Sequence, residues 1–167
     1  MATGPASMGQ TALHTEPQGS LTGMAKSPYD MFATDPSKET DGIIINYSDQ
    51  FWLKVSRAGG ANSKFKKVLA DKLRPHRRAI QTETLSEETA DRLLREAVVD
   101  GLLLGWGTGV YPEGAGSIPG RDGPMAFSRE NALALFSDLP ELFRDVYEQA
   151  SRAAAFRAGE AEQDAGN

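Results

Sequence analysis

Few side chains in this sequence have a type and spacing that would support catalysis or cofactor binding. The chain contains no cysteine, which excludes a disulfide framework, a thiol nucleophile and every cysteine-ligated zinc or iron–sulfur site. It has only two histidines, His14 and His76, so a multi-histidine metal site is excluded as well. His76 has arginines beside it and no acidic neighbour that would make it a general base. We therefore predict no catalytic residue, no metal site and no cofactor, and a protein that is not an enzyme.

A glycine-rich motif, Gly105-Trp106-Gly107-Thr108-Gly109, is the one pattern that invites a phosphate-binding interpretation. That chemistry needs a strand before the glycines and a helix N-terminus after them, so that backbone N–H groups converge on the phosphate. Here a helix is expected before the motif, and Val110-Tyr111-Pro112 follows it. We therefore interpret residues 105–124 as an exposed loop.

Charge is strongly segregated along the chain, although the net charge is only -5. Residues 54–78 contain nine basic side chains and one acidic one, and both flanking regions are acidic. Such segregation favours a charged partner surface, or self-association between unlike patches. Because the whole chain is acidic, with a pI near 5.1, a protein-contacting or solvated face is favoured over nucleic-acid binding.

The length of 167 residues suits one domain with tails. Residues 1–41 are rich in small and polar residues without apolar periodicity and are predicted to be a disordered leader. Within the leader, residues 1–23 are interpreted as an upstream extension before a natural start at Met24. A single domain is expected over 42–157, followed by a frayed tail over 158–167. No apolar run is long enough to cross a bilayer.

The elements predicted for this domain are a β-hairpin followed by helices. Period-2 alternation indicates a hairpin over 42–57, and helical periodicity indicates helices over about 63–73, 86–104, 129–137 and 139–157. Asn62 and Ser128 are expected to cap helices, Thr84 and Ser86 remain alternative caps, and Asp138 with Glu141 resembles a capping box. The fold class expected is mainly α, with a small N-terminal β-hairpin and a helical domain of about four helices.

The order of several short motifs resembles the phage tail assembly chaperones of long-tailed phages. The motifs run from Val55-Ser56-Arg57-Ala58-Gly59-Gly60-Ala61-Asn62 through Leu73-Arg74-Pro75, Leu103-Leu104-Gly105-Trp106 and Phe127-Ser128-Arg129-Glu130-Asn131 to Asp138-Leu139-Pro140-Glu141-Leu142 and Ala153-Ala154-Ala155-Phe156-Arg157. The resemblance extends from about Met24 to the C-terminus. The segment 111–124 is longer than the corresponding loop of the family pattern.

This resemblance implies a non-catalytic protein that binds the tape measure protein and helps to recruit tail tube subunits during tail assembly. It also implies a location in the host cytoplasm and absence from the mature virion. The alternative is a minor structural tail protein or head–tail connector protein of the virion. We predict a partner surface that includes Trp52, Lys54, Arg57, Lys64, Lys67, Arg74, Arg77 and Trp106.

Overall fold

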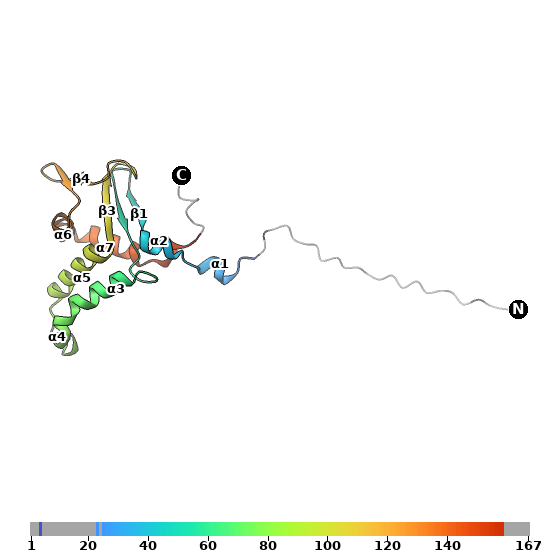
Figure 1. Ribbon diagram of the computed structural model, residues 1–167, viewed down its shortest axis with the longest axis horizontal. Helices are drawn as coiled ribbons and strands as arrows, with labels where there is room; N and C mark the ends of the chain where they lie inside the picture. The colour runs from blue at the N-terminus through green and yellow to red at the C-terminus, as the bar shows by residue number, and fades with distance from the viewer. Residues whose placement is uncertain (1–3, 5–22, 24, 159–167) are drawn as a thin grey trace.

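The computed structural model describes residues 4, 23 and 25–158 (Figure 1). The predicted extension over 1–23 and the predicted tail over 158–167 therefore lie outside the described residues, apart from Gly4, Gly23 and Ala158.

Residues 25–41, which we expected to belong to a disordered leader, form two short helices, α1 (Pro28–Phe32) and α2 (Pro36–Asp41). Each helix begins with proline, whose fixed φ suits the first helical position. The backbone N–H of Asp30 donates to the Ser27 hydroxyl over 3.1 Å, and that of Ser37 donates to the Asp35 carboxylate over 2.9 Å. The prediction of disorder was wrong here because composition outweighed these local capping signals.

Three strands form an antiparallel sheet in the order β1-β2-β3: β1 (Ile43–Tyr47), β2 (Phe51–Val55) and β3 (Leu103–Thr108). The β1–β2 turn places Ser48 and Asp49 in the left-handed region, with φ of 52° and 58°. The Asn46 side chain supports this turn by donating to the Asp49 carboxylate over 2.8 Å. The hairpin expected from the sequence is therefore present, but it is part of a larger sheet.

The third strand overturns the mainly helical fold class. The predicted helix over 86–104 ends early, as α5 (Glu87–Gly101), and the chain then turns into β3. Gly101 lies so close to Phe65 that a Cβ atom there would be 3.1 Å from the Phe65 ring. The apolar residues after Gly101 continue the helical stripe in sequence, yet they pair with the open edge of β2 because that edge needs backbone hydrogen bonds.

The glycine-rich segment is not a simple loop either. It contains the end of β3 and a second, two-stranded sheet formed by β4 (Ser117–Pro119) and β5 (Pro124–Ala126). The backbone N–H of Gly116 donates to the Trp106 carbonyl over 2.8 Å and ties this hairpin to β3. The chain consequently has a mixed α+β fold with two sheets.

The remaining helices are α3 (Ser63–Leu73), α4 (Arg77–Gln81), α6 (Arg129–Asp138) and α7 (Pro140–Ser151), with 3-10 turns at Arg74–His76 and Ala153–Phe156. Asn62, Ser86 and Ser128 accept the N-terminal capping bonds of α3, α5 and α6. Asp138 does not cap α7 as expected; Leu139 occupies that position without a side-chain bond.

The core lies between one face of the three-stranded sheet and the helices, chiefly α5, α6 and α7. Leu53 and Val55 from β2, Val98 from α5, Phe136 from α6 and Val146 from α7 are completely buried. Burial of this apolar surface is the main favourable contribution to folding. The same packing fixes the C-terminal end of α5 on the sheet. The rest of α5 and α3 extend away from the sheet (Figure 1).

Candidate protein-binding surface

The most prominent surface feature is a helical projection that we call the basic arm, residues 63–81, made of α3, the 3-10 turn and α4. Figure 1 shows α3 and α5 leaving the sheet side by side, with α4 at the far end. The arm is joined to the body by an apolar seam between α3 and α5. In that seam Phe65 and Leu93 are buried, and Val68, Leu69 and Leu94 are half-buried.

A carboxylate at the base of the arm joins three helices. Asp100 on α5 pairs with Lys72 of α3 at 2.8 Å and with Arg129 of α6 at 2.7 Å. Burial raises the pKa of Asp100, but the hydrogen bonds and positive charges of Arg129 and Lys72 outweigh it, so the pKa lies below its ordinary value. The carboxylate is thus held ionised between two cations and fixes the arm relative to α6.

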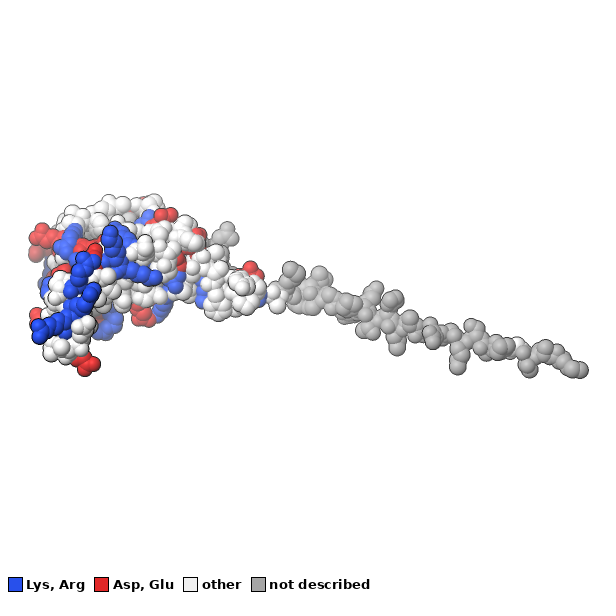
Figure 2. Space-filling model, turned by 60° about the horizontal axis from the view of Figure 1, so that its bottom comes forward, with Lys and Arg blue, Asp and Glu red and all other residues white. Residues whose placement is uncertain are grey.

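The outward side of the basic arm is cationic. Five exposed cations there make no ion pair with any described residue: Lys64, Lys66, Lys67, Arg77 and Arg78. A sixth, Arg74, pairs with Asp71 at 2.6 Å, but both side chains are largely exposed. Figure 2 shows Lys and Arg side chains gathered over the projecting part of the molecule. Exposed cations clustered on one projection attract an acidic partner and speed its encounter.

The far end of the arm carries apolar and acidic side chains, in contrast to its basic side. Ile80 is 42% exposed there, in contrast to the buried seam. Glu83 follows α4, and Glu87 and Glu88 lie in the first turn of α5, all of them exposed. The arm therefore has a basic side, an exposed apolar residue and an acidic end, a combination that suits a protein partner better than a uniform polyanion.

The predicted site residues divide into two groups. Lys64, Lys67, Arg74 and Arg77 all lie on the basic arm. The two tryptophans do not belong to a surface, since Trp52 is 3% exposed and Trp106 is 1% exposed. Including them in a partner surface was wrong because both rings pack inside the fold.

Trp52 is held by the segment that follows β3. Its indole N–H donates to the Glu113 carbonyl over 2.9 Å, and Tyr111 packs edge-on against its ring at 4.9 Å. Lys54, also predicted as a contact residue, is half-buried on β2, away from the arm in sequence and in element. Trp106 contacts Phe127 edge-on at 5.2 Å. These aromatic rings pack against the sheet inside the protein and do not form an exposed surface on which a partner could stack.

Arg57 also has a structural role. It pairs with Glu39 of α2, a residue that is 2% exposed and whose carboxylate accepts a hydrogen bond from the backbone N–H of Ala61 over 2.6 Å. The side-chain hydrogen bond from Thr34, with those from Ala61 and Arg57, lowers the pKa of Glu39 despite its burial. Arg57 thus neutralises a buried charge and is not available to a partner through that contact.

Comparison with known proteins gives a family assignment for most of the chain. A family model described as "YdaY prophage protein" matches residues 60–167. The chain belongs to the YdaY prophage protein family. It is therefore a phage-derived protein. No curated protein and no solved structure matches the chain.

In this YdaY family protein, the matched region begins at the glycine before α3 and contains the whole basic arm. Two arm residues that the predicted site omitted, Lys66 and Arg78, are exposed on it. Arg78 lies four residues after Arg74, so helical spacing could have indicated it, because residues three or four apart in a helix are neighbours. Lys66 is not three or four residues from any predicted member of the site, and helical spacing could not have indicated it. Lys72, by contrast, forms an ion pair with Asp100.

Two further observations concern the part of the YdaY family chain that the structure describes. Among residues 25–158 no cluster of three or more potential metal-ligating side chains occurs. Within the same residues no helix has the length and apolarity needed to span a bilayer.

Proposed function

We propose that this protein is a non-catalytic phage tail assembly chaperone that binds the tape measure protein and helps to recruit tail tube subunits. The observation that carries the proposal is the group of exposed cations on the projecting arm that form no ion pair with a described residue. Membership of a prophage family and the ordered motifs that resemble tail assembly chaperones support it.

The arm suits a chaperone because its interaction would be fast and reversible. Exposed cations that are not committed to internal ion pairs raise the association rate with an acidic surface, and they contribute modestly to affinity. Ile80 adds one exposed apolar contact at the end of the arm. A helical partner such as a tape measure protein could lie along this side and be released later.

The location follows from the same proposal. A chaperone acts in the host cytoplasm and is absent from the finished particle. The alternative, a minor tail or head–tail connector protein, predicts a fixed number of copies in purified particles. Quantitative mass spectrometry of virions from an induced prophage separates these two outcomes, because stoichiometric copies would contradict the chaperone proposal.

Co-expression with the tape measure protein of the same prophage tests the arm directly. Reversal of two arm charges, Lys67→Glu with Arg78→Glu, is expected to reduce co-purification at least tenfold, because it replaces attraction by repulsion. The matched control is Arg144→Glu with Arg152→Glu, which changes the net charge equally on exposed positions of α7 and its C-terminal cap.

Two results of this experiment would overturn the proposed function. One is a wild-type protein that does not retain the tape measure protein. The other is an equal loss for the arm variant and the α7 control, which would show a non-specific charge effect. Salt-sensitive binding of duplex DNA by the wild-type chain, lost in the arm variant, would assign the arm to nucleic acid instead.

A further inference from the structure

α1 presents an apolar surface that is largely exposed. Tyr29 is 84% exposed, Phe32 is 65% exposed and Met31 is 48% exposed. The Arg157 guanidinium lies 5.0 Å from the centroid of the Phe32 ring. Clustered exposed aromatic residues are typical of interaction sites because their burial contributes most to binding.

Hydrogen bonds at both ends of α1 hold this helix in a fixed position. Ser27 and Asp30 form a reciprocal capping box at its start. Beyond its end, the backbone N–H of Asp35 donates to the Phe156 carbonyl over 2.8 Å, and Thr34 pairs with Arg157 in an isolated bridge. An apolar helix fixed in an exposed position loses little conformational entropy when it binds.

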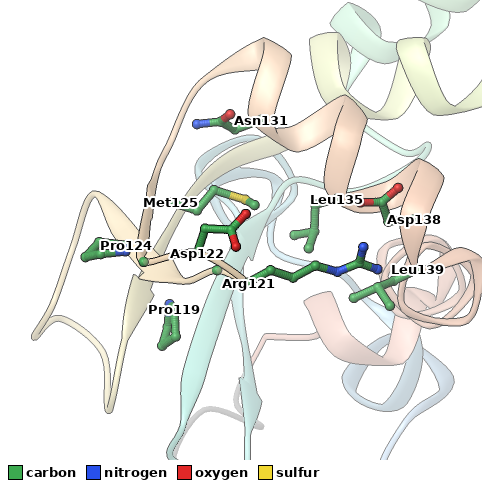
Figure 3. Close-up of a pocket in the computed structure, with 11 residues that line it drawn as sticks. Pro119, Arg121, Asp122, Pro124, Met125, Asn131, Leu135, Asp138 and Leu139 are labelled. Carbon is green, nitrogen blue, oxygen red and sulfur yellow. The ribbon is translucent and has the colours of Figure 1, made fainter.

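A pocket of about 610 Å³ lies between the β4–β5 turn and α6 (Figure 3). Its apolar lining includes Met125, Leu135 and Leu139, and Figure 3 shows Met125 of β5 and Leu135 of α6 on opposite sides of it. The volume is in the range of pockets that hold ligands, about 300–1,000 Å³, and is sufficient for one or two aromatic side chains.

The pocket rim carries three charged side chains. Arg121, Asp122 and Asp138 line the pocket, and none of them forms an ion pair with a described residue. The α1 segment carries one charge of each sign, with Lys26 before the helix and Asp30 within it. Each charge on the segment therefore has an opposite charge available on the rim, which would fix the orientation of a bound α1.

One molecule cannot join these two surfaces by itself, since α1 and the β4 hairpin lie on opposite sides of the body (Figure 1). We propose that α1 of one copy inserts Tyr29 and Phe32 into the pocket of a second copy, which gives head-to-tail association. The contact uses two different patches, so each molecule keeps one free α1 and one free pocket. This association is independent of the arm and of the proposed function.

Sedimentation equilibrium of the full chain tests this association. The wild-type average mass is expected to rise above 18.0 kDa as the concentration increases from about 10 µM to about 1 mM, the range for a small interface. Tyr29→Ala with Phe32→Ala removes the inserted side chains, and Leu139→Arg or Arg121→Glu alters the pocket. Each variant alone is expected to remain monomeric.

Mixing the two kinds of variant gives the decisive result. The pocket variant still has an intact α1, and the α1 variant still has an intact pocket, so an equimolar mixture is expected to form heterodimers and nothing larger. The matched control, Ile80→Ala with Val110→Ala, removes two exposed apolar side chains elsewhere and is expected to associate like wild type.

Three outcomes would overturn the proposal. They are a wild-type chain that stays monomeric at about 1 mM, an α1 variant that associates like wild type, and a mixture of the two folded variants that stays monomeric. Circular dichroism establishes that each variant is folded. Arg121→Glu provides a pocket variant if Leu139→Arg does not fold, since Arg121 is an exposed turn residue.

Discussion

The carboxylate of Glu39 and the guanidinium of Arg57 form an ion pair beneath the surface, joining α2 to the loop that precedes α3. The pair encloses Gly60, whose φ of 56° brings its backbone against both side chains. A Cβ atom at Gly60 would lie 2.5 Å from the Glu39 carboxylate and 2.6 Å from Arg57. The N-terminal segment is thereby attached to the part of the chain that carries the basic arm.

Replacing Glu39 by glutamine should destabilise the protein by about 2–4 kcal/mol, because the change leaves Arg57 without its buried counter-charge. Urea unfolding monitored by circular dichroism measures the loss. The control is Glu141→Gln, whose exposed pair with Arg144 should contribute less than about 1 kcal/mol. Equal stability of Glu39→Gln and wild type would contradict a structural role for the pair.

The contribution of Glu39 should also depend on pH in a predictable direction. Its pKa in the folded protein lies below its ordinary value, so the unfolded state binds the proton more readily. The stability from the ionised carboxylate is present above the unfolded pKa, about 4.3, and is lost as the pH falls through the lower folded value. The stability difference between wild type and Glu39→Gln should therefore be constant from pH 7 to pH 6 and decrease below about pH 4.

Gly107 is required by the Trp52 ring, because a Cβ atom at position 107 would lie 2.3 Å from that ring. Gly107→Ala should therefore cost about 1–3 kcal/mol, the usual range for overpacking, and should shift the tryptophan fluorescence to the red. Gly105 provides a matched control on the same strand, since no heavy atom lies within 4 Å of its Cβ position. Thermal denaturation of both variants decides the question, and an equal loss for the two would exclude the steric explanation.

The sequence predicted the short-range structure of this chain better than its long-range pairing. The helix predicted over 63–73 coincides with α3, and Asn62 caps it, because periodicity and capping are local properties. The strand after Gly101 could not be predicted in the same way. Leu102 and Leu103 continue a helical apolar stripe, and only the partner strand 48 or more residues earlier in the chain makes the backbone extended from Leu103 onward.

The predicted site shows the same limit. Lys64 and Lys67, both predicted as contact residues, lie one turn apart on the exposed side of α3, as the helix predicted over 63–73 requires. Burial of Trp52 depends on the remote Tyr111–Glu113 segment and could not be inferred from its neighbours in sequence. An exposed tryptophan and a buried tryptophan in a strand have the same local pattern.

Asp100→Asn should loosen the base of the basic arm, since it removes the negative charge that Lys72 and Arg129 share. We expect a loss of about 1–2 kcal/mol, more than an exposed pair contributes, because the carboxylate is one-quarter exposed and accepts charge-assisted hydrogen bonds. Amide hydrogen exchange should increase in α3 before it increases in β2. Uniform exchange throughout the chain would show that Asp100 supports the whole fold and not the arm specifically.

Tyr47 connects β1 to α7 through a hydrogen bond from its hydroxyl to the Asp145 carboxylate over 2.6 Å. Burial raises the pKa of Tyr47 above its ordinary value, and the hydrogen bond and negative charge of Asp145 raise it further. The neutral phenol thus contributes stability that is present below the unfolded pKa of about 10 and is lost as the pH rises through the folded value.

Tyr47→Phe should therefore cost about 1–2 kcal/mol at pH 7, where Asp145 keeps its bond from Gln149 at 2.8 Å. Ultraviolet titration measures the ionisation itself. In the folded protein the tyrosinate absorbance that develops up to about pH 11 should be the same for wild type and Tyr47→Phe, because the half-buried phenol, hydrogen-bonded to Asp145, remains protonated there. A smaller absorbance change in the variant would mean that Tyr47 ionises as an exposed tyrosine does and that its bond to Asp145 does not hold the proton.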